Sequence, residues 1–252
     1  MLEIRQTFGV EIQGLTKQYK DVTALDNLSL EIVSGELFGL LGPNGSGKTT
    51  TINCLSGLVK PTKGKMKVAG FDVESEIQKV RAVLGVSPQE TAVYSHLSGR
   101  ENIELFGSLY SIPKDELKRN TEYLLEKVGL VEDAKRRVGR YSGGMKRRAN
   151  LAMALVQDPK IAFLDEPTVT MDPQARRAIW DFIRELKAKG KTIILTTHYM
   201  EEAEELCDRV GIIDHGKLIE LGSPAELRSK YGAKTLEDVF IQLTGRGIRE
   251  GA

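Results

Sequence analysis

The amino-acid sequence predicts an α/β fold built on a parallel β-sheet, and three observations indicate it. The stretch at residues 36–58 is an apolar strand pattern that breaks into glycines and resumes as a helical pattern. Residues 160–166 form an apolar run that ends in two acids, as a central parallel strand does when both faces are buried. The chain has 252 residues, 40% of them apolar, which suffices for a large core.

Composition excludes several classes of protein. The 36 basic and 35 acidic residues leave a net charge of +1, so no overall field recruits nucleic acid. Cys54 and Cys207 lie in no metal-ligand pattern and are expected to be buried thiols in a reducing compartment. The N-terminal stretch lacks the pattern of a signal peptide, and no window has the run of apolar residues that a membrane span needs. We therefore expect a chain that does not cross a membrane by itself.

The glycine-rich break is a complete phosphate-binding loop, G-x-x-x-x-G-K-[ST]. Its residues are Gly42, Pro43, Asn44, Gly45, Ser46, Gly47, Lys48 and Thr49. The glycines allow backbone N–H groups to form an anion nest, and the following helix directs its positive end there. Lys48 would reach the β- and γ-phosphates, and Thr49 would offer its hydroxyl to Mg²⁺. The alternative, an ordinary turn with an incidental lysine, is disfavoured by the flanking strand and helix.

Strands are also predicted before the loop, at residues 10–19 and 28–32, with polar turns between them. Tyr19 ends the first strand shortly before the phosphate loop. Its ring could stack on a nucleotide base or could be ordinary packing.

After the loop, residues 65–69 and 83–87 read as strands, and the second leads directly to Gln89. From about residue 91 to residue 157 the pattern becomes helical. Residues 113–128 place four apolar side chains on one stripe, behind a proline suited to a first helical turn.

Another helix start closes this helical stretch. Ser142 can cap a helix whose first turn contains Gly143 and Gly144. Adjacent glycines weaken a helix, and the basic residues 146–148 crowd its positive end, so a purely structural helix start is disfavoured. The combination suits an anion and indicates a second phosphate nest.

The acids that end the buried strand are Asp165 and Glu166. Carboxylates at this end of a parallel strand face the crevice where α/β sheets bind ligands. One acid would suit a Mg²⁺ shell, and the adjacent one would orient or deprotonate water. The alternative is a polar loop start.

A turn containing Asp172 precedes an amphipathic helix at residues 174–189, and residues 192–197 form a further buried strand. His198 follows that strand, which is expected to run parallel to the acid-bearing one. A role at the γ-phosphate is therefore favoured for His198. His96 and His215 have no such placement.

The C-terminal part predicts a hairpin over residues 209–220 that turns at residues 214–216. Small helices follow it. Ser223 begins a capping box with proline at the first helical position, Thr235 begins the second helix and Gly245 ends it.

Taken in order, these motifs resemble ATP-binding cassette (ABC) ATPase subunits over essentially the whole chain. The matching elements are the aromatic Tyr19, the phosphate loop, the glutamine-loop residue Gln89, the signature Ser142-Gly143-Gly144, the acid-ended strand and the switch histidine His198. The stretches YSGGMKRR and THYMEEAEELCDRV and the ending TLEDVFIQLTG most resemble the ATP-binding subunits of multidrug, polysaccharide or ABC-2 exporters.

The resemblance implies one ABC ATP-binding domain over residues 1–252. It would have a parallel-sheet core, an N-terminal antiparallel β portion, a helical subdomain at about residues 91–157 and small helices at about residues 222–246. Two such subunits would pair so that each ATP lies between the phosphate loop of one and the signature of the other. The pair is expected to be a homodimer, bound to an integral membrane permease at the cytoplasmic face of the membrane, with no nucleic acid.

The resemblance also implies roles for residues. Tyr19, the phosphate loop and Thr50 would bind ATP, while Thr49, Gln89 and Asp165 would hold Mg²⁺. Glu166 would polarise the attacking water, with Lys48, Gln89 and His198 completing the catalytic set, and Asp172 would lie in the loop at the dimer interface. The implied activity is Mg²⁺-dependent ATP hydrolysis that powers an exporter.

The sequence departs from the family pattern at several positions. Met145 stands where glutamine is usual, and Tyr141 where leucine is usual. Thr170 and Met171 stand where the family usually has glycine and leucine before the aspartate. Because a β-branched residue does not easily take a positive φ, the loop around Asp172 is expected to be altered.

A second function remains open, that of a soluble ABC ATPase in DNA maintenance, translation or iron–sulfur assembly. Only 93 residues separate Lys48 from Ser142, which leaves no room for the long coiled coils of DNA-maintenance relatives. Translation relatives usually carry two cassettes, and this chain has one. An assembly-type subunit is not excluded by length.

Overall fold

The computed structural model describes residues 7–245. The chain forms two compact units, each described by itself: unit 1 comprises residues 1–81 and 192–252, and unit 2 comprises residues 82–191. No helix within the described residues is long and apolar enough to span a membrane.

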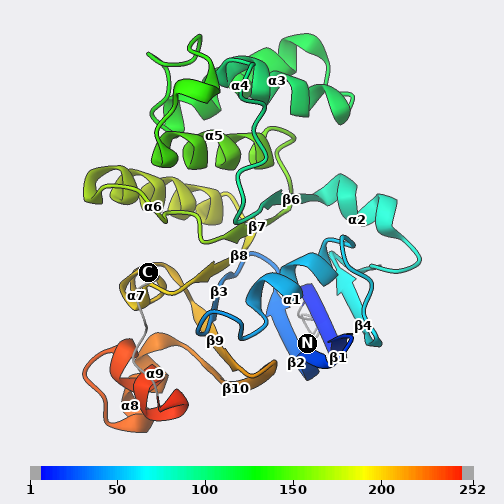
Figure 1. Ribbon diagram of the computed structural model, residues 1–252, viewed down its shortest axis with the longest axis vertical. Helices are drawn as coiled ribbons and strands as arrows, with labels where there is room; N and C mark the ends of the chain where they lie inside the picture. The colour runs from blue at the N-terminus through cyan, green and yellow to red at the C-terminus, as the bar shows by residue number, and fades with distance from the viewer. Residues whose placement is uncertain (1–6, 246–252) are drawn as a thin grey trace, which may run out of the picture. The chain divides into compact units, whose positions relative to one another are not determined.

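Unit 1 contains an antiparallel sheet in which β1 (Phe8–Tyr19) lies between β2 (Val22–Val33) and β4 (Lys63–Val68), with β5 (Phe71–Asp72) beside β4 (Figure 1). The predicted strand at residues 28–32 is too short. β2 begins six residues earlier, because residues 22–27 continue the pairing with β1 up to Tyr19, which lies opposite Val22. The turn is therefore confined to residues 20–21.

The same unit contains parallel strands. β3 (Leu37–Leu41) lies between β8 (Thr192–Thr197) and β9 (Arg209–Asp214), and pairs in parallel with both. β10 (Lys217–Gly222) forms the predicted hairpin with β9. Every residue of β3 and β8 is buried, as the unbroken apolar runs predict.

The helices of unit 1 are α1 (Lys48–Leu55), α2 (Ile77–Val83, which ends in unit 2), α7 (Met200–Leu206), α8 (Pro224–Tyr231) and α9 (Leu236–Thr244). The predicted caps are present. Ser223 forms a capping box with proline at the first helical position, Thr235 caps α9 and Gly245 ends it in the left-handed conformation.

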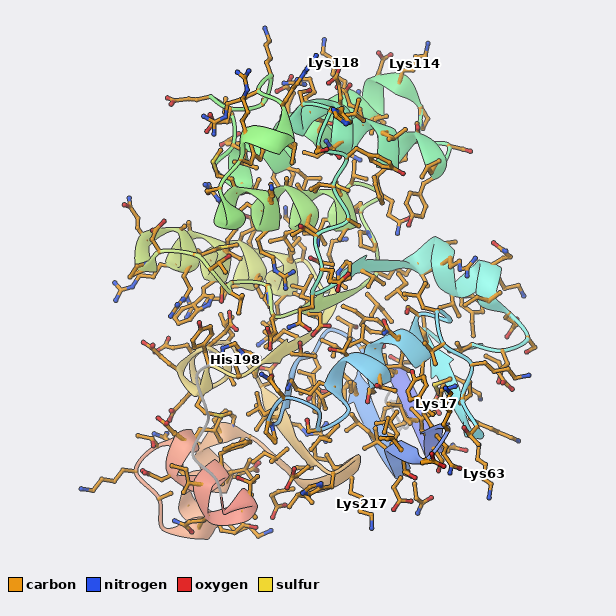
Figure 2. All side chains as sticks on the ribbon, viewed as in Figure 1. Lys17, Lys63, Lys114, Lys118, His198 and Lys217 are labelled. Carbon is orange, nitrogen blue, oxygen red and sulfur yellow. The ribbon has the colours of Figure 1, made fainter. Side chains whose placement is uncertain are left out.

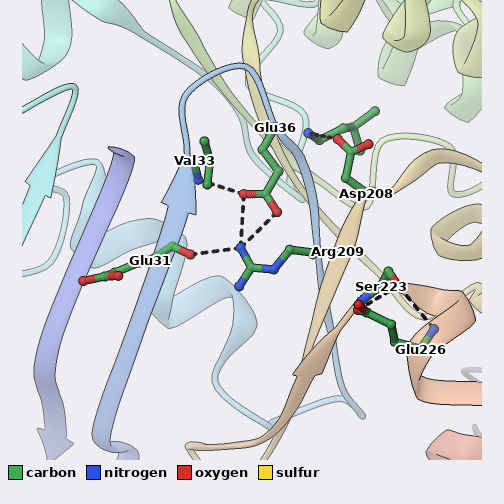
Figure 3. A network of polar contacts seen from close by, with 8 residues as sticks. Glu31, Val33, Glu36, Asp208, Arg209, Ser223 and Glu226 are labelled. Carbon is green, nitrogen blue, oxygen red and sulfur yellow. Dashed lines mark hydrogen bonds and ion pairs between the residues drawn. The ribbon is translucent and has the colours of Figure 1, made fainter. Parts of the chain in front are cut away.

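A polar network fixes the start of β3 (Figure 3). The buried Glu36 carboxylate accepts hydrogen bonds from Val33 N–H at 2.7 Å and from the Arg209 guanidinium at 3.2 Å. Asp208 accepts one from Leu37 N–H at 2.9 Å. Because a buried carboxylate without partners would be costly, the network holds the end of β2 and the start of β9 at the start of β3.

Unit 2 contains the parallel pair β6 (Leu84–Ser87) and β7 (Ile161–Asp165), with α3 (Gly99–Leu109), α4 (Lys114–Lys127), a 3₁₀ turn (Val138–Arg140), α5 (Gly143–Leu155) and α6 (Pro173–Ala188). Helices α3, α4 and α5 pack against one another (Figure 1). The expected strand at residues 83–87 starts one residue later because Val83 ends α2.

Two helix starts differ from prediction. Residues 91–98 are not helical, because Ser98 and Glu101 form a capping box that starts α3 at Gly99. Pro113 is the N-cap residue of α4 and lies outside its first turn.

Candidate functional site

The phosphate loop of unit 1 presents backbone N–H groups at the start of α1. Gly47 is the N-cap residue, with φ of 113° and no side-chain cap, and Gly45 has φ of 81°. Both conformations favour glycine. The first turn of α1 has no acidic residue, and a Cβ at Gly45 would meet nothing within 4 Å. The loop therefore offers an open anion nest whose donors are not used by a cap.

The loop is anchored by the β9–β10 turn and by β2. The Gly216 N–H donates to the Ser46 carbonyl at 3.0 Å, and the Asp26 N–H donates to the Gly216 carbonyl at 2.9 Å. A Cβ at Gly42 would lie 2.3 Å from the Ile213 carbonyl oxygen. The sequence signalled Gly216 only as a hairpin residue, because its contact with the loop is long-range.

Side chains of the loop fit an anionic ligand. The Lys48 ammonium lies along the loop and donates to the carbonyls of Gly42 at 2.7 Å and Pro43 at 3.1 Å. The Ser46 hydroxyl is buried and has no hydrogen-bond partner among residues 7–245. Such unsatisfied groups are rare, and a hydroxyl here can donate to a phosphate oxygen. Thr49 is exposed at the same helix start, and Thr50 is half-buried.

His198 leaves the sheet beside the phosphate loop. Leu41 of β3 is paired with Thr197 of β8, so the next residues, Gly42 and His198, follow neighbouring strand ends at one edge. The half-buried imidazole packs on the Tyr199 ring at a centroid distance of 4.3 Å. Figure 2 labels this side chain. The prediction that His198 ends a buried strand is confirmed.

Tyr19 ends β1 with 43% of its surface exposed, so its ring is not part of the core. The Lys17 ammonium lies 4.7 Å from the ring centroid. Because the ring is exposed, stacking on a planar ligand is favoured over ordinary packing in the core.

In unit 2, Gln89 and Glu166 are brought together. Gln89 Nε2 donates to Glu166 Oε2 at 3.2 Å. Asp165 is the last residue of β7 and is buried, as is Glu166. Glu166 has φ of 49°, a left-handed conformation that costs of order 1–3 kcal/mol in a non-glycine residue and is typical of functional sites.

Arg147 holds the loops that follow β6 and β7 through hydrogen bonds to their carbonyls. Its buried guanidinium donates to the carbonyls of Pro88 at 2.8 Å, Gln89 at 2.5 Å and Glu166 at 3.0 Å, and also to that of Asp165. Because charged donors strengthen such bonds, this side chain fixes where Gln89 and Glu166 stand.

For two of the three basic residues at positions 146–148, Arg147 and Arg148, the contacts differ from the interpretation that they attract an anion. Arg147 is used in the carbonyl contacts just described. Arg148 donates to the carbonyls of Val128 and Gly129, each at 2.8 Å. Both side chains fold back onto backbone carbonyls and organise unit 2.

The signature forms the predicted helix start. Ser142 is the N-cap residue of α5, and its hydroxyl accepts from Met145 N–H at 3.2 Å. Gly143 and Gly144 lie in the first turn. A Cβ at Gly144 would lie 3.1 Å from the Thr170 carbonyl oxygen, so the close passage of this loop disfavours a side chain there.

The loop before α6 keeps a left-handed residue despite the departure from glycine. Thr170 has φ of 65°, which disagrees with the expectation that threonine would avoid this region. Asp172 caps α6 by accepting from Ala175 N–H at 2.9 Å, and this hydrogen bond lowers the pKa of its carboxyl group. The Asp172 cap after Thr170 and the hydrogen bond from Met171 N–H to the Thr168 carbonyl at 3.2 Å hold the loop around Thr170, although threonine disfavours this conformation.

No group of three or more His, Cys, Asp or Glu side chains that could hold a metal occurs within residues 7–245. Both cysteines are buried, as predicted, and burial raises the pKa of the Cys54 thiol to about 11.

Comparison with known proteins decides the family. The ABC transporter profile matches residues 25–169, more than half of the chain. The chain belongs to the ABC transporter family. Its fold is therefore that of an ABC ATPase, and the predicted ATPase activity is confirmed at the level of the family.

Curated ABC relatives cover nearly the whole chain. The linearmycin resistance ATP-binding protein LnrL of Bacillus subtilis is 43% identical, over 96% of this chain and 76% of its own. The doxorubicin resistance ATP-binding protein DrrA of Mycobacterium tuberculosis is 44% identical, over 96% and 72%. The Nod factor export ATP-binding protein I of a Rhizobium species is 43% identical, over 90% and 75%.

Solved ABC structures have the same fold. An ATP-binding subunit of an ABC transporter superposes with a TM-score of 0.86 at 28% identity, covering 93% of this chain and 99% of its own. A dimeric ATP-binding cassette in a post-hydrolysis state, bound to ADP and Pi, has a TM-score of 0.80 at 27% identity, covering 85% and 98%.

Proposed function

We propose that this chain hydrolyses ATP at sites shared by two copies of itself and thereby powers an integral membrane permease that exports its substrate. The observation that carries the proposal is the Gln89–Glu166 pair, in which a buried carboxylate accepts an amide hydrogen bond at 3.2 Å. A carboxylate so held is oriented to accept a proton from water.

In this proposal the residues of unit 1 bind ATP. The N–H groups of the phosphate loop and the Lys48 ammonium hold the β- and γ-phosphates, and the Tyr19 ring stacks on the base. His198 donates a hydrogen bond to the γ-phosphate, where negative charge develops in the transition state. The adjacent ends of β3 and β8 support this role for His198.

The residues of unit 2 act on the water. Glu166 accepts its proton, and Gln89 holds the carboxylate and responds to the γ-phosphate. Thr49, Gln89 and Asp165 are the proposed ligands of Mg²⁺, which neutralises phosphate charge when bound.

The second phosphate nest supports a shared site. One chain carries the phosphate loop and also Ser142, Gly143 and Gly144 at the start of α5. We propose that the signature of one copy binds the ATP held by the phosphate loop of the other, with Asp172 in the loop at that interface. A dimeric relative of the same fold supports the pairing.

Export is supported by the names of the relatives, which are drug-resistance and export ATP-binding proteins. They disfavour the alternative of a soluble assembly ATPase. A permease needs a docking surface. Leu105 and Leu109 of α3 are exposed, and so are Tyr110 directly after the helix and Tyr94 before it. We propose that this apolar surface binds the permease and keeps the chain at the cytoplasmic face of the membrane.

The docking surface is tested with Leu109→Glu, which should abolish co-purification with the permease while leaving ATP affinity unchanged. Leu58→Glu is the matched control, because Leu58 is similarly exposed but lies in unit 1. Equal permease recovery with both variants would move the docking site elsewhere.

The catalytic assignment is tested with Glu166→Gln. The amide keeps the size of the side chain but cannot accept a proton, so turnover should fall about 10²- to 10⁴-fold. ATP binding should persist, and a long-lived ATP-bound dimer should elute from a sizing column. Turnover near that of the parent chain would exclude Glu166 as the base.

A further inference from the structure

Thr170 has a backbone conformation that glycine would adopt at no steric cost but that is unfavourable for threonine. Its φ of 65° is a genuine outlier for a β-branched side chain. Such outliers persist where the surrounding structure determines them, and they cluster at functional sites. The side chain is exposed, and its hydroxyl has no hydrogen-bond partner among residues 7–245. What threonine adds over glycine at this position is therefore a hydroxyl that is not used within the chain.

That hydroxyl lies beside the signature. The Thr170 hydroxyl oxygen is the atom nearest to the point where a Cβ of Gly143 would stand, at 3.5 Å. The Thr170 carbonyl oxygen approaches Gly144 in the same way. The Ser142 hydroxyl accepts the Met145 N–H, so the first-turn N–H groups of Gly143 and Gly144 are not used by this side-chain cap.

We propose that the Thr170 hydroxyl is an additional hydrogen-bond donor to the triphosphate that a second copy presents to the signature. This inference rests on the shared site proposed above. A hydroxyl can donate to an anionic phosphate oxygen, and hydrogen bonds to charged groups are the strong ones. A glycine at this position has no side chain with which to make this contact, so the contact distinguishes this chain from relatives with glycine.

Three substitutions in a Glu166→Gln background separate the hydroxyl from the backbone. Thr170→Ser keeps the hydroxyl, Thr170→Val keeps the β-branched shape without it, and Thr170→Gly removes the side chain and the unfavourable conformation. A two-fold symmetric dimer contains two such hydroxyls. If each contributes about tenfold, the valine and glycine variants should dimerise about a hundredfold more weakly in ATP, while serine stays within about threefold of the parent.

The measurement is the dissociation constant of the dimer by sedimentation equilibrium with Mg²⁺ and ATP, beside the melting temperature of each variant. The melting temperature shows whether each variant is folded, independently of dimerisation. ATP affinity of the monomer, measured with a fluorescent ATP analogue, should be the same in all three because the phosphate loop is untouched.

The outcomes are distinguishable. A valine variant that dimerises as tightly as the serine variant would overturn the role of the hydroxyl and leave the shared site intact. Weak dimerisation in valine with full recovery in glycine would assign the effect to the backbone and would also overturn the inference. A parent that does not dimerise in ATP would overturn the shared site and this inference with it.

Discussion

The chain has two glycine-rich helix starts, and they use their backbone donors differently. At α1 the N-cap residue is Gly47, which has no side chain to accept the N–H groups. At α5 the N-cap residue is Ser142, whose hydroxyl already accepts from Met145 N–H. The first start is open and depends on a ligand to satisfy its donors, whereas the second is partly satisfied by its own chain.

Their positive charge is also distributed differently. Lys48 follows the α1 cap directly and lies within the loop, in contact with its carbonyls. At α5, Arg147 and Arg148 point back to backbone carbonyls of unit 2. We infer that α1 holds the ATP tightly, and that α5 makes a weaker contact that completes the site when two copies meet.

The sharpest test of this comparison mixes two inactive variants, Lys48→Ala at the first nest and Ser142→Arg at the second. Each alone should lose nearly all turnover. Under random exchange about half of the dimers are mixed, and each mixed dimer has one intact site of two, so about a quarter of wild-type sites should return. Phosphate release and ATP-dependent dimerisation are measured together.

No recovery on mixing, while the wild-type chain shows both dimer and turnover under the same conditions, would count against shared sites. The phosphate loop and the signature would then act on different ligands. Recovery of the dimer without turnover would indicate that both sites must be intact at once.

His198 lies beside the phosphate loop at the start of α1, and its replacement should have the next largest effect on turnover. His198→Ala should retain ATP binding and lose turnover about 10²- to 10³-fold, because one hydrogen bond to developing charge is removed. His96→Ala is the control, since His96 is exposed and lies outside the proposed site. A lower melting temperature with unchanged activity per folded molecule would make His198 a structural residue.

The two nests also show what could be predicted from sequence. The caps at Ser142, Ser223 and Thr235 were predicted correctly because a cap depends on residues within one helical turn. The role of Arg147 was missed, since it depends on carbonyls after β6 and β7 that are distant in sequence. The left-handed Thr170 was also missed, because the hydrogen bond across it, from Met171 N–H to the Thr168 carbonyl, and the Asp172 cap outweigh its intrinsic preference.

The smallest expected effect concerns the cap that distinguishes the two nests. Ser142→Ala removes the acceptor for Met145 N–H, so the free energy of unfolding should fall by about 1 kcal/mol and the melting temperature by about 2–4 °C. Ser98→Ala is a matched control in the same unit, because Ser98 caps α3 in the same way but lies outside the proposed site. If Ser142 only caps its helix, both variants should melt earlier by similar amounts and should dimerise in ATP as the parent does. If it also contacts the ATP of the second copy, as we propose, only Ser142→Ala should weaken the ATP-bound dimer in the Glu166→Gln background. Equal dimerisation by the two variants would show that the Ser142 side chain only caps α5 and does not contact the ATP of the second copy.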